Sequence, residues 1–118
     1  MNPEKPIITE HTMIAWECPY YRVRRDQIRL QDGTEGLYHV LEMRDSVFVV
    51  PVLEDGRIVL IYSYRHTLGE WVWEVPAGGI KPDQSPENAA RAELQEEIGG
   101  NASHLRFLLK ARDRKSVV

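Results

Sequence analysis

The pattern of apolar and polar residues predicts paired strands in the first part of the chain. Thr12–Arg29 is rich in aromatic and β-branched residues, and Pro19 breaks it into two strands or marks an edge position. Within this stretch, Tyr20–Leu30 alternates with arginine, as in a strand with one solvated face. Gln31–Thr34 has Asp-Gly at its centre, which predicts a hairpin turn, and Leu37–Met43 is then the returning strand.

The middle of the chain predicts strands that are buried. Val47–Leu53 is a nearly continuous apolar run, typical of a strand covered on both faces, although Pro51 lacks the N–H that a central strand needs. Ile58–Arg65 predicts another buried strand, and Trp71–Val75 a short one. The short strand leads into Pro-Ala-Gly-Gly at residues 76–79, a tight bend where the backbone can come close to a ligand.

A single helix follows the bend. Ser85 is a suitable N-cap and Pro86 suits the first helical position. Gly99 lies at the usual place for the left-handed residue that ends a helix. The apolar stripe of this helix is formed by Ala90, Leu94 and Ile98. Beyond the helix, Leu105–Leu109 predicts one more strand.

Composition and charge narrow the class of protein. The 118 residues suffice for one domain, and a net charge of −3 gives no general attraction to nucleic acid or to anionic membranes. Cys18 is the only cysteine, which fits a reducing compartment, and no apolar run reaches membrane-spanning length. We therefore expect a cytoplasmic protein with neither a nucleic acid nor a membrane as partner. Four arginines (Arg22, Arg24, Arg25 and Arg29) cluster locally, and we interpret them as an exposed strand edge rather than as a phosphate site.

The candidate chemistry lies in a glutamate triplet on the helix. Glu93, Glu96 and Glu97 share one helical face, and like charges four residues apart repel each other. A hard divalent cation would compensate this charge, because such cations take oxygen ligands. The alternative is an ordinary solvated helix face, since glutamate is a good helix former. The triplet alone leaves both interpretations open.

Residues 73–100 resemble the Nudix hydrolase family. Gly78 aligns with the first glycine of the family motif, and Glu93–Gly99 aligns with its Glu-Leu-x-Glu-Glu-x-Gly core. The lead-in at residues 73–78 is similar to that of ADP-ribose pyrophosphatases, as are Tyr64 and Arg65 upstream. The resemblance implies an α/β (α+β) fold: a mixed β-sheet with the motif helix packed on it, preceded by an N-terminal antiparallel β-hairpin.

The same resemblance implies a reaction and its residues. We expect Mg²⁺-dependent (or Mn²⁺-dependent) hydrolysis of the pyrophosphate bond in a nucleoside diphosphate derivative, either ADP-ribose or a nucleotide sugar. Glu93 and Glu97 are the implied direct metal ligands, Glu96 binds directly or through water, and the carbonyl of Ala77 is a further ligand. Glu96 and Glu97 are also the implied catalytic residues.

Substrate binding is assigned to Arg65 and Glu74. The planar guanidinium of Arg65 suits a phosphate, while the alternative is a surface arginine at a strand end. Glu74 contacts the metal cluster or the substrate, or else makes a structural hydrogen bond to the bend. Trp71 and Trp73 share a strand face and could stack a nucleobase, but core packing is the preferred use of at least one.

Two positions depart from the family motif. Gln84 replaces its first glutamate and Ala92 its arginine, so the charged pair that braces the family's loop is missing. Arg91 lies about 100° around the helix from Ala92 and cannot replace that arginine. These departures favour an alternative function, a non-catalytic Nudix-like module that binds a nucleotide or a protein.

The length of the chain suggests a domain division and an assembly. We expect a flexible leader over residues 1–11, the hairpin region over 12–45, and a Nudix core over 46–118 that is incomplete at its C-terminus, with fewer than twenty residues after Gly100. Exposed apolar sheet surface would follow, and such patches mark interfaces. We therefore expect a homodimer in which the hairpin of one chain lies on the other, as in the ADP-ribose pyrophosphatases that the chain resembles.

Overall fold

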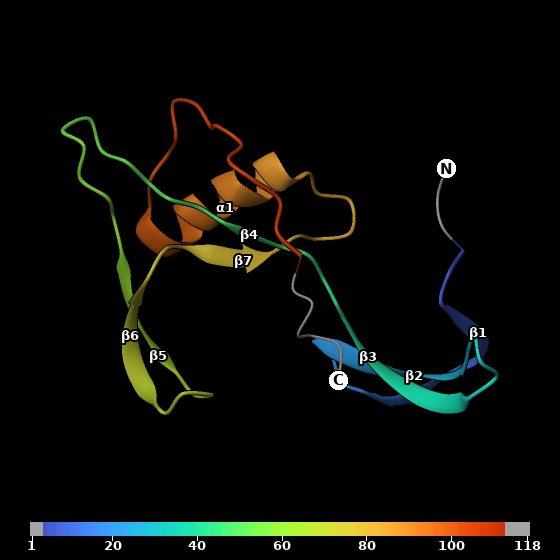
Figure 1. The fold of residues 1–118 in the computed structure, drawn as a ribbon. Helices are drawn as coiled ribbons and strands as arrows, with labels where there is room; N and C mark the ends of the chain where they lie inside the picture. The colour runs from blue at the N-terminus through green and yellow to red at the C-terminus, as the bar shows by residue number, and fades with distance from the viewer. Residues whose placement is uncertain (1–3, 113–118) are drawn as a thin grey trace. The chain divides into compact units, whose positions relative to one another are not determined.

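The computed structural model describes residues 4–112, which form two compact units (Figure 1). One unit contains the described residues up to Met43 and from Leu109 onward, and the other runs from Arg44 to Leu108. The α+β class is confirmed, as are the antiparallel N-terminal strands. None of the helices in the described range is both long and apolar enough to span a membrane.

The first unit is a three-stranded antiparallel sheet. Its strands are β1 (Ile7–Glu17), β2 (Tyr21–Leu30) and β3 (Glu35–Met43), in the order β1-β2-β3. The predicted turn over residues 31–34 is confirmed, since the N–H of Leu30 donates to the carbonyl of Thr34 at 2.8 Å. The sequence predicts a flexible leader over residues 1–11. In the structure β1 already begins within that stretch, at Ile7, which pairs with Leu30. The three-part division of the chain stays a prediction.

The arginine cluster does not mark an edge, and that expectation is wrong. β2 lies between β1 and β3, so its arginines project from the central strand. Arg24 pairs with Asp26 at 3.0 Å and with Glu42 at 3.4 Å, and Arg22 reaches Glu42 at 3.1 Å. The carboxylate of Asp26 is buried and also accepts a hydrogen bond from the Thr12 hydroxyl at 2.8 Å. These contacts hold the pKa of Asp26 below its usual value, with the Arg24 hydrogen bond as the main cause. The cluster therefore supports the sheet through charge pairing.

The second unit combines two short antiparallel sheets with one helix. β4 (Ser46–Phe48) pairs with β7 (Ala77–Gly79), and β5 (Ile61–Arg65) pairs with β6 (Glu70–Glu74). The helix α1 (Pro86–Ile98) packs on β4 and β7, as Figure 1 shows. A small core forms around this contact from Val49, Pro76, Ala89 and Leu94.

The ends of α1 are set by the residues that the sequence indicates. The hydroxyl of Ser85 accepts a hydrogen bond from the N–H of Asn88 at 3.1 Å, so the predicted N-cap is confirmed. Gly99 has a φ of 66° in the left-handed region, where only glycine is free of strain. Its N–H donates to the carbonyl of Gln95 at 3.1 Å, which satisfies a carbonyl at the end of the helix.

Burial of the apolar runs is less than predicted. The strand in the 47–53 run is limited to β4, and both Phe48 and Val52 are exposed. In the 58–65 run the strand begins only at Ile61. The prediction of a strand over 105–109 is also wrong for the described residues, where this segment is irregular and Phe107 is exposed. For the first two runs the physical reason is that each short sheet pairs only two strands, which leaves part of each apolar run uncovered.

Candidate active site

The bend at residues 76–79 is held in place by backbone hydrogen bonds. The buried Pro76 offers its carbonyl to the N–H of Val49 at 2.9 Å, and the N–H of Ile80 donates to the carbonyl of Asp45 at 2.8 Å. Between these bonds, Ala77 lies opposite Phe48 in the β4–β7 register. The predicted backbone ligand at Ala77 thus belongs to the strand on which α1 packs.

The carboxylate of Glu93 lies directly against Gly78. A Cβ atom placed on Gly78 would be 2.0 Å from Oε1 of Glu93 and 2.6 Å from Oε2, distances that real contacts do not reach. Only glycine therefore leaves room for this carboxylate at the bend. The structure brings together two features that the sequence predicts separately, the Gly-rich bend and the first glutamate of the triplet.

The triplet carries negative charge that no ion pair in the described part of the chain neutralises. Within residues 4–112, the carboxylates of Glu93, Glu96 and Glu97 take part in no hydrogen bond or ion pair. Partial burial raises the pKa of Glu93, and the charges of Glu96 and Glu97 raise it further, while Lys81 opposes them. The pKa of Glu93 thus reports a partly buried carboxylate near two others, whose effect the charge of Lys81 offsets only in part.

The two predicted substrate-binding residues contact each other. Nε of Arg65, on β5, donates to Oε2 of Glu74, on β6, at 3.0 Å, and Nη2 of Arg65 pairs with Oε1. The hydrogen bond from Arg65 lowers the pKa of Glu74, and Glu74 in turn raises that of Arg65. A smaller contribution to the pKa of Arg65 comes from the charge of Glu97, so the guanidinium lies within electrostatic reach of α1. Glu74 does not bond to the bend, which was one of the alternatives.

The donor types suit a hard divalent cation. No group of three or more His, Cys, Asp or Glu side chains between residues 4 and 112 is gathered closely enough to form a metal site as it stands. Yet three carboxylates within five residues, none of them in an ion pair within residues 4–112, are the kind of ligands that Mg²⁺ and Mn²⁺ prefer. The residues therefore fit such an ion by charge and by donor chemistry.

The loop between the bend and α1 is closed by Gln84, a contact that the sequence analysis missed. Oε1 of Gln84 accepts from the N–H of Lys81 at 3.1 Å, and the N–H of Gln84 donates to the carbonyl of Lys81 at 3.0 Å. Arg91 instead binds the carbonyl of Ala102 at 2.9 Å, which confirms that it does not replace the missing arginine at position 92.

The two tryptophans share a face of β6, as predicted, but neither is buried. Trp71 is 57% exposed and Trp73 is 67% exposed, so the expectation of core packing for one of them is wrong. Tyr62 stacks against both, with ring centroids 5.3 Å from Trp71 and 4.7 Å from Trp73, and Tyr64 lies 5.7 Å from Trp71. The period-two spacing of the tyrosines on β5 was the signal for this aromatic face.

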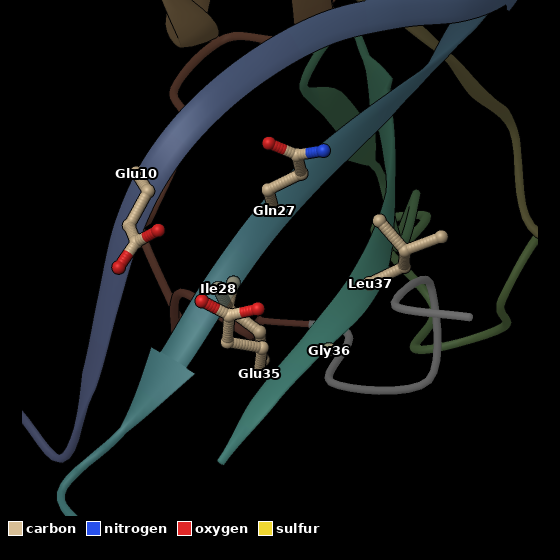
Figure 2. A pocket seen from close by; sticks show the side chains of 6 residues that line it. All are labelled: Glu10, Gln27, Ile28, Glu35, Gly36 and Leu37. Atoms are coloured by element: carbon tan, nitrogen blue, oxygen red, sulfur yellow. The ribbon is translucent and has the colours of Figure 1, made fainter. Parts of the chain in front are cut away.

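A hollow of about 310 Å³ lies in the first unit and contains none of the predicted site residues (Figure 2). It is lined by Glu10, Gln27, Ile28, Glu35, Gly36 and Leu37. Arg29 pairs with both of its carboxylates, directly with Glu10 and at 3.0 Å with Glu35. The two carboxylates that line the hollow are therefore already neutralised by Arg29.

Comparison with known proteins places this chain in a family. The chain is 37% identical over 90 residues to the ADP-ribose pyrophosphatase of Mycobacterium tuberculosis, covering 75% of this chain and 44% of that protein. It is 41% identical over 97 residues to the ADP-sugar pyrophosphatase of Mus musculus, covering 79% of this chain and 44% of that protein. The chain thus spans less than half the length of these two relatives.

A solved structure supports the fold. The crystal structure of an ADP compounds hydrolase matches 98% of this chain and 63% of its own chain, with a TM-score of 0.85 and 23% sequence identity. The NUDIX domain profile matches residues 42–117, well over half of the chain, including the bend and the glutamate triplet. The chain therefore belongs to the NUDIX family.

Proposed function

We propose that this protein hydrolyses the pyrophosphate bond of a nucleoside diphosphate derivative, with ADP-ribose or an ADP-sugar as the first substrates to test. The observation that carries the proposal is the position of Glu93: its carboxylate lies against the bend at Gly78 and beside two more carboxylates on α1. The relatives from M. tuberculosis and Mus musculus, an ADP-ribose pyrophosphatase and an ADP-sugar pyrophosphatase, support the substrate class.

The proposed metal is Mg²⁺ or Mn²⁺, held by Glu93, Glu96, Glu97 and the carbonyl of Ala77. When bound, such an ion neutralises phosphate charge and lowers the pKa of a water molecule that attacks the pyrophosphate. The three carboxylates supply the negative charge that retains the ion, and their mutual repulsion is relieved when it binds. Glu96 and Glu97 are the proposed catalytic residues of this cluster.

Arg65 is the proposed contact for a substrate phosphate. Its guanidinium presents several N–H donors in one plane, a geometry that matches two phosphate oxygens. The charge of Glu97 acts on Arg65, which supports a substrate position between β5 and the C-terminal end of the carboxylate cluster on α1. Glu74 is the second proposed residue of this substrate region.

A second candidate function is a binding module without turnover. Two observations favour it: the motif glutamate and arginine are replaced by Gln84 and Ala92, and the carboxylates are not gathered into a formed metal site within residues 4–112. The contact between Gln84 and Lys81 weighs against it, because it closes the loop without the missing pair.

One assay separates these two functions. The purified protein is incubated with Mg²⁺ and, separately, with ADP-ribose, sugar nucleotides and dinucleoside polyphosphates, and nucleoside monophosphate release is measured. Release above background supports the hydrolase. Saturable binding of ADP-ribose without release supports the binding module and contradicts the proposed hydrolysis.

We also propose a homodimer. Large apolar side chains are exposed on the sheet of the first unit, among them Trp16 (54%), Leu37 (57%) and Met43 (59%), and an uncovered apolar face of this kind favours an interface. Light scattering at micromolar concentration tests this, and a monomer contradicts it. The proposed location is the cytoplasm, supported by the single cysteine, and the net charge of −3 supports a partner other than nucleic acid.

A further inference from the structure

The geometry of Arg65 divides its guanidinium into an occupied edge and an open edge. A guanidinium carries five N–H groups in one plane. Glu74 takes the inner edge, where Nε and Nη2 both donate to its carboxylate. The outer edge, formed by Nη1 and the second proton of Nη2, donates to no acceptor between residues 4 and 112. The side chain of Arg65 remains 51% exposed, while that of Glu74 is only 23% exposed.

These two exposures separate the roles of the partners. Glu74 is the more enclosed member, and each oxygen of its carboxylate accepts one hydrogen bond from Arg65, so the carboxylate faces the arginine. Arg65 is the more accessible member and keeps an unused pair of donors. Two parallel N–H groups at the outer edge match two oxygens of a phosphate.

We infer that Glu74 is a positioning residue: it fixes the plane of the Arg65 guanidinium so that the outer edge of Arg65 is presented to a phosphate group of the ligand. This inference rests on the proposed function and corrects one part of it, since Glu74 then acts through Arg65 and does not touch the substrate. The gain in phosphate affinity comes from pre-organisation, because a long side chain that is already immobilised loses less entropy when the ligand binds.

Glu74 can also act in the opposite direction, by weakening phosphate binding. The two roles predict changes in phosphate affinity of opposite sign when the charge of Glu74 is removed. A carboxylate beside an arginine also competes with any anion for that arginine, and its negative charge repels a phosphate. If competition dominates, removing the charge of Glu74 strengthens phosphate binding. If positioning dominates, the same change weakens binding, because the guanidinium becomes free to rotate.

The experiment measures the binding of AMP to metal-free protein by calorimetry for the wild type and for Glu74→Gln. We expect Glu74→Gln to weaken AMP binding about tenfold. This factor corresponds to the free-energy cost of immobilising one long side chain when AMP binds. Glu74→Asp keeps the carboxylate on a shorter side chain, so its AMP affinity should lie between those of the wild type and Glu74→Gln. With ADP-ribose as substrate, Glu74→Gln should raise KM and leave kcat within about twofold, as a loss of uniform binding does.

Glu70→Gln is the matched control. Glu70 lies directly opposite Arg65 in the β5–β6 register, and its carboxylate takes part in no ion pair within the described residues. The change removes the same charge from the same hairpin and leaves the Arg65–Glu74 contact intact. AMP affinity should stay within about twofold of the wild type or rise slightly, as expected from charge alone at an exposed site.

Several outcomes overturn the inference. AMP binding that is unchanged or tighter in Glu74→Gln, or an equal loss in Glu70→Gln, contradicts positioning, as does a wild type that does not bind AMP. If Glu74→Gln does not fold, as judged by circular dichroism, Glu74→Asp decides, and wild-type affinity in that variant also contradicts positioning. The proposed hydrolysis can fail on its own. In that case AMP binding depends on Glu74, but ADP-ribose releases no nucleoside monophosphate.

Discussion

The substitution Gly78→Ala tests how the bend positions the first glutamate of the triplet. The added Cβ would lie 2.0 Å from Oε1 of Glu93 and 2.1 Å from its Cδ. Since real contacts of a Cβ essentially never fall under 3.0 Å, the carboxylate has to move by at least about 1 Å. The atoms that it meets belong to the end of a flexible side chain, so Glu93 can swing away while the backbone stays in place.

Function should therefore be lost without loss of the fold. A displacement of about 1 Å in a catalytic group can cost roughly 100-fold in rate, and we expect kcat/KM for ADP-ribose to fall by about that factor. Mg²⁺ affinity, measured by calorimetry, should fall at least about tenfold. Stability should change little or rise, because Gly78 does not have a positive φ and replacing glycine by alanine at such a site stabilises by about 0.4–1 kcal/mol.

Gly79→Ala is the matched control for this prediction. Gly79 is the next residue of β7, it also lacks a positive φ, and a Cβ added there would meet nothing within 4 Å. Its activity and Mg²⁺ affinity should equal those of the wild type. Full activity in Gly78→Ala, or an equal loss in both variants, would refute the argument that Gly78 makes room for Glu93.

Two further predictions concern stability. Ser85→Ala removes the N-cap bond to Asn88 and should lower the free energy of unfolding in urea by about 1 kcal/mol, whereas an unchanged urea midpoint would mean that the cap contributes nothing. The pKa of Glu93 is raised in the folded state, so its ionised form costs stability as the pH rises through that raised pKa. Metal-free Glu93→Gln should therefore be more stable than the wild type at pH 7, and the difference should disappear below 4.5, the ordinary pKa of a glutamate side chain; a pH-independent difference would contradict this.

The helix could be predicted from the sequence because its determinants are local. Ser85, Pro86 and Gly99 act within one turn of the residues that they cap, and the glutamate spacing follows from the helical period. The bend before it was also predictable, since Gly78 and Gly79 are adjacent in the chain. Short-range geometry therefore gave both the elements of the site and their order.

Burial could not be predicted in the same way. An apolar run such as Val47–Leu53 shows which side chains can be buried, but not whether another layer covers them. Strand order has the same limitation: the arginines of β2 suggested an edge, whereas pairing with β3 places β2 in the centre and Glu42 beside Arg22. Both errors concern contacts between segments that are distant in the sequence.

The site shows the same division between local and distant contacts. The Arg65–Glu74 pair joins residues nine positions apart on two strands, and they do not face each other in the β5–β6 register, where Arg65 lies opposite Glu70. Only the structure shows that Arg65 reaches along the hairpin to Glu74. Likewise, the motif spacing places Gly78 and Glu93 in the site, but their direct contact depends on how α1 packs on β7.

The substitution Glu97→Gln tests whether the carboxylate face of α1 is the catalytic site. The variant keeps the size of the side chain and removes one charge, and Glu87→Gln removes one charge from the first turn of the same helix as a control. Hydrolysis of ADP-ribose with Mg²⁺ is followed by ³¹P NMR, which resolves the pyrophosphate from the monophosphate products. We expect turnover in the wild type and in Glu87→Gln and none in Glu97→Gln, with all three folded. Full turnover in Glu97→Gln would contradict this expectation.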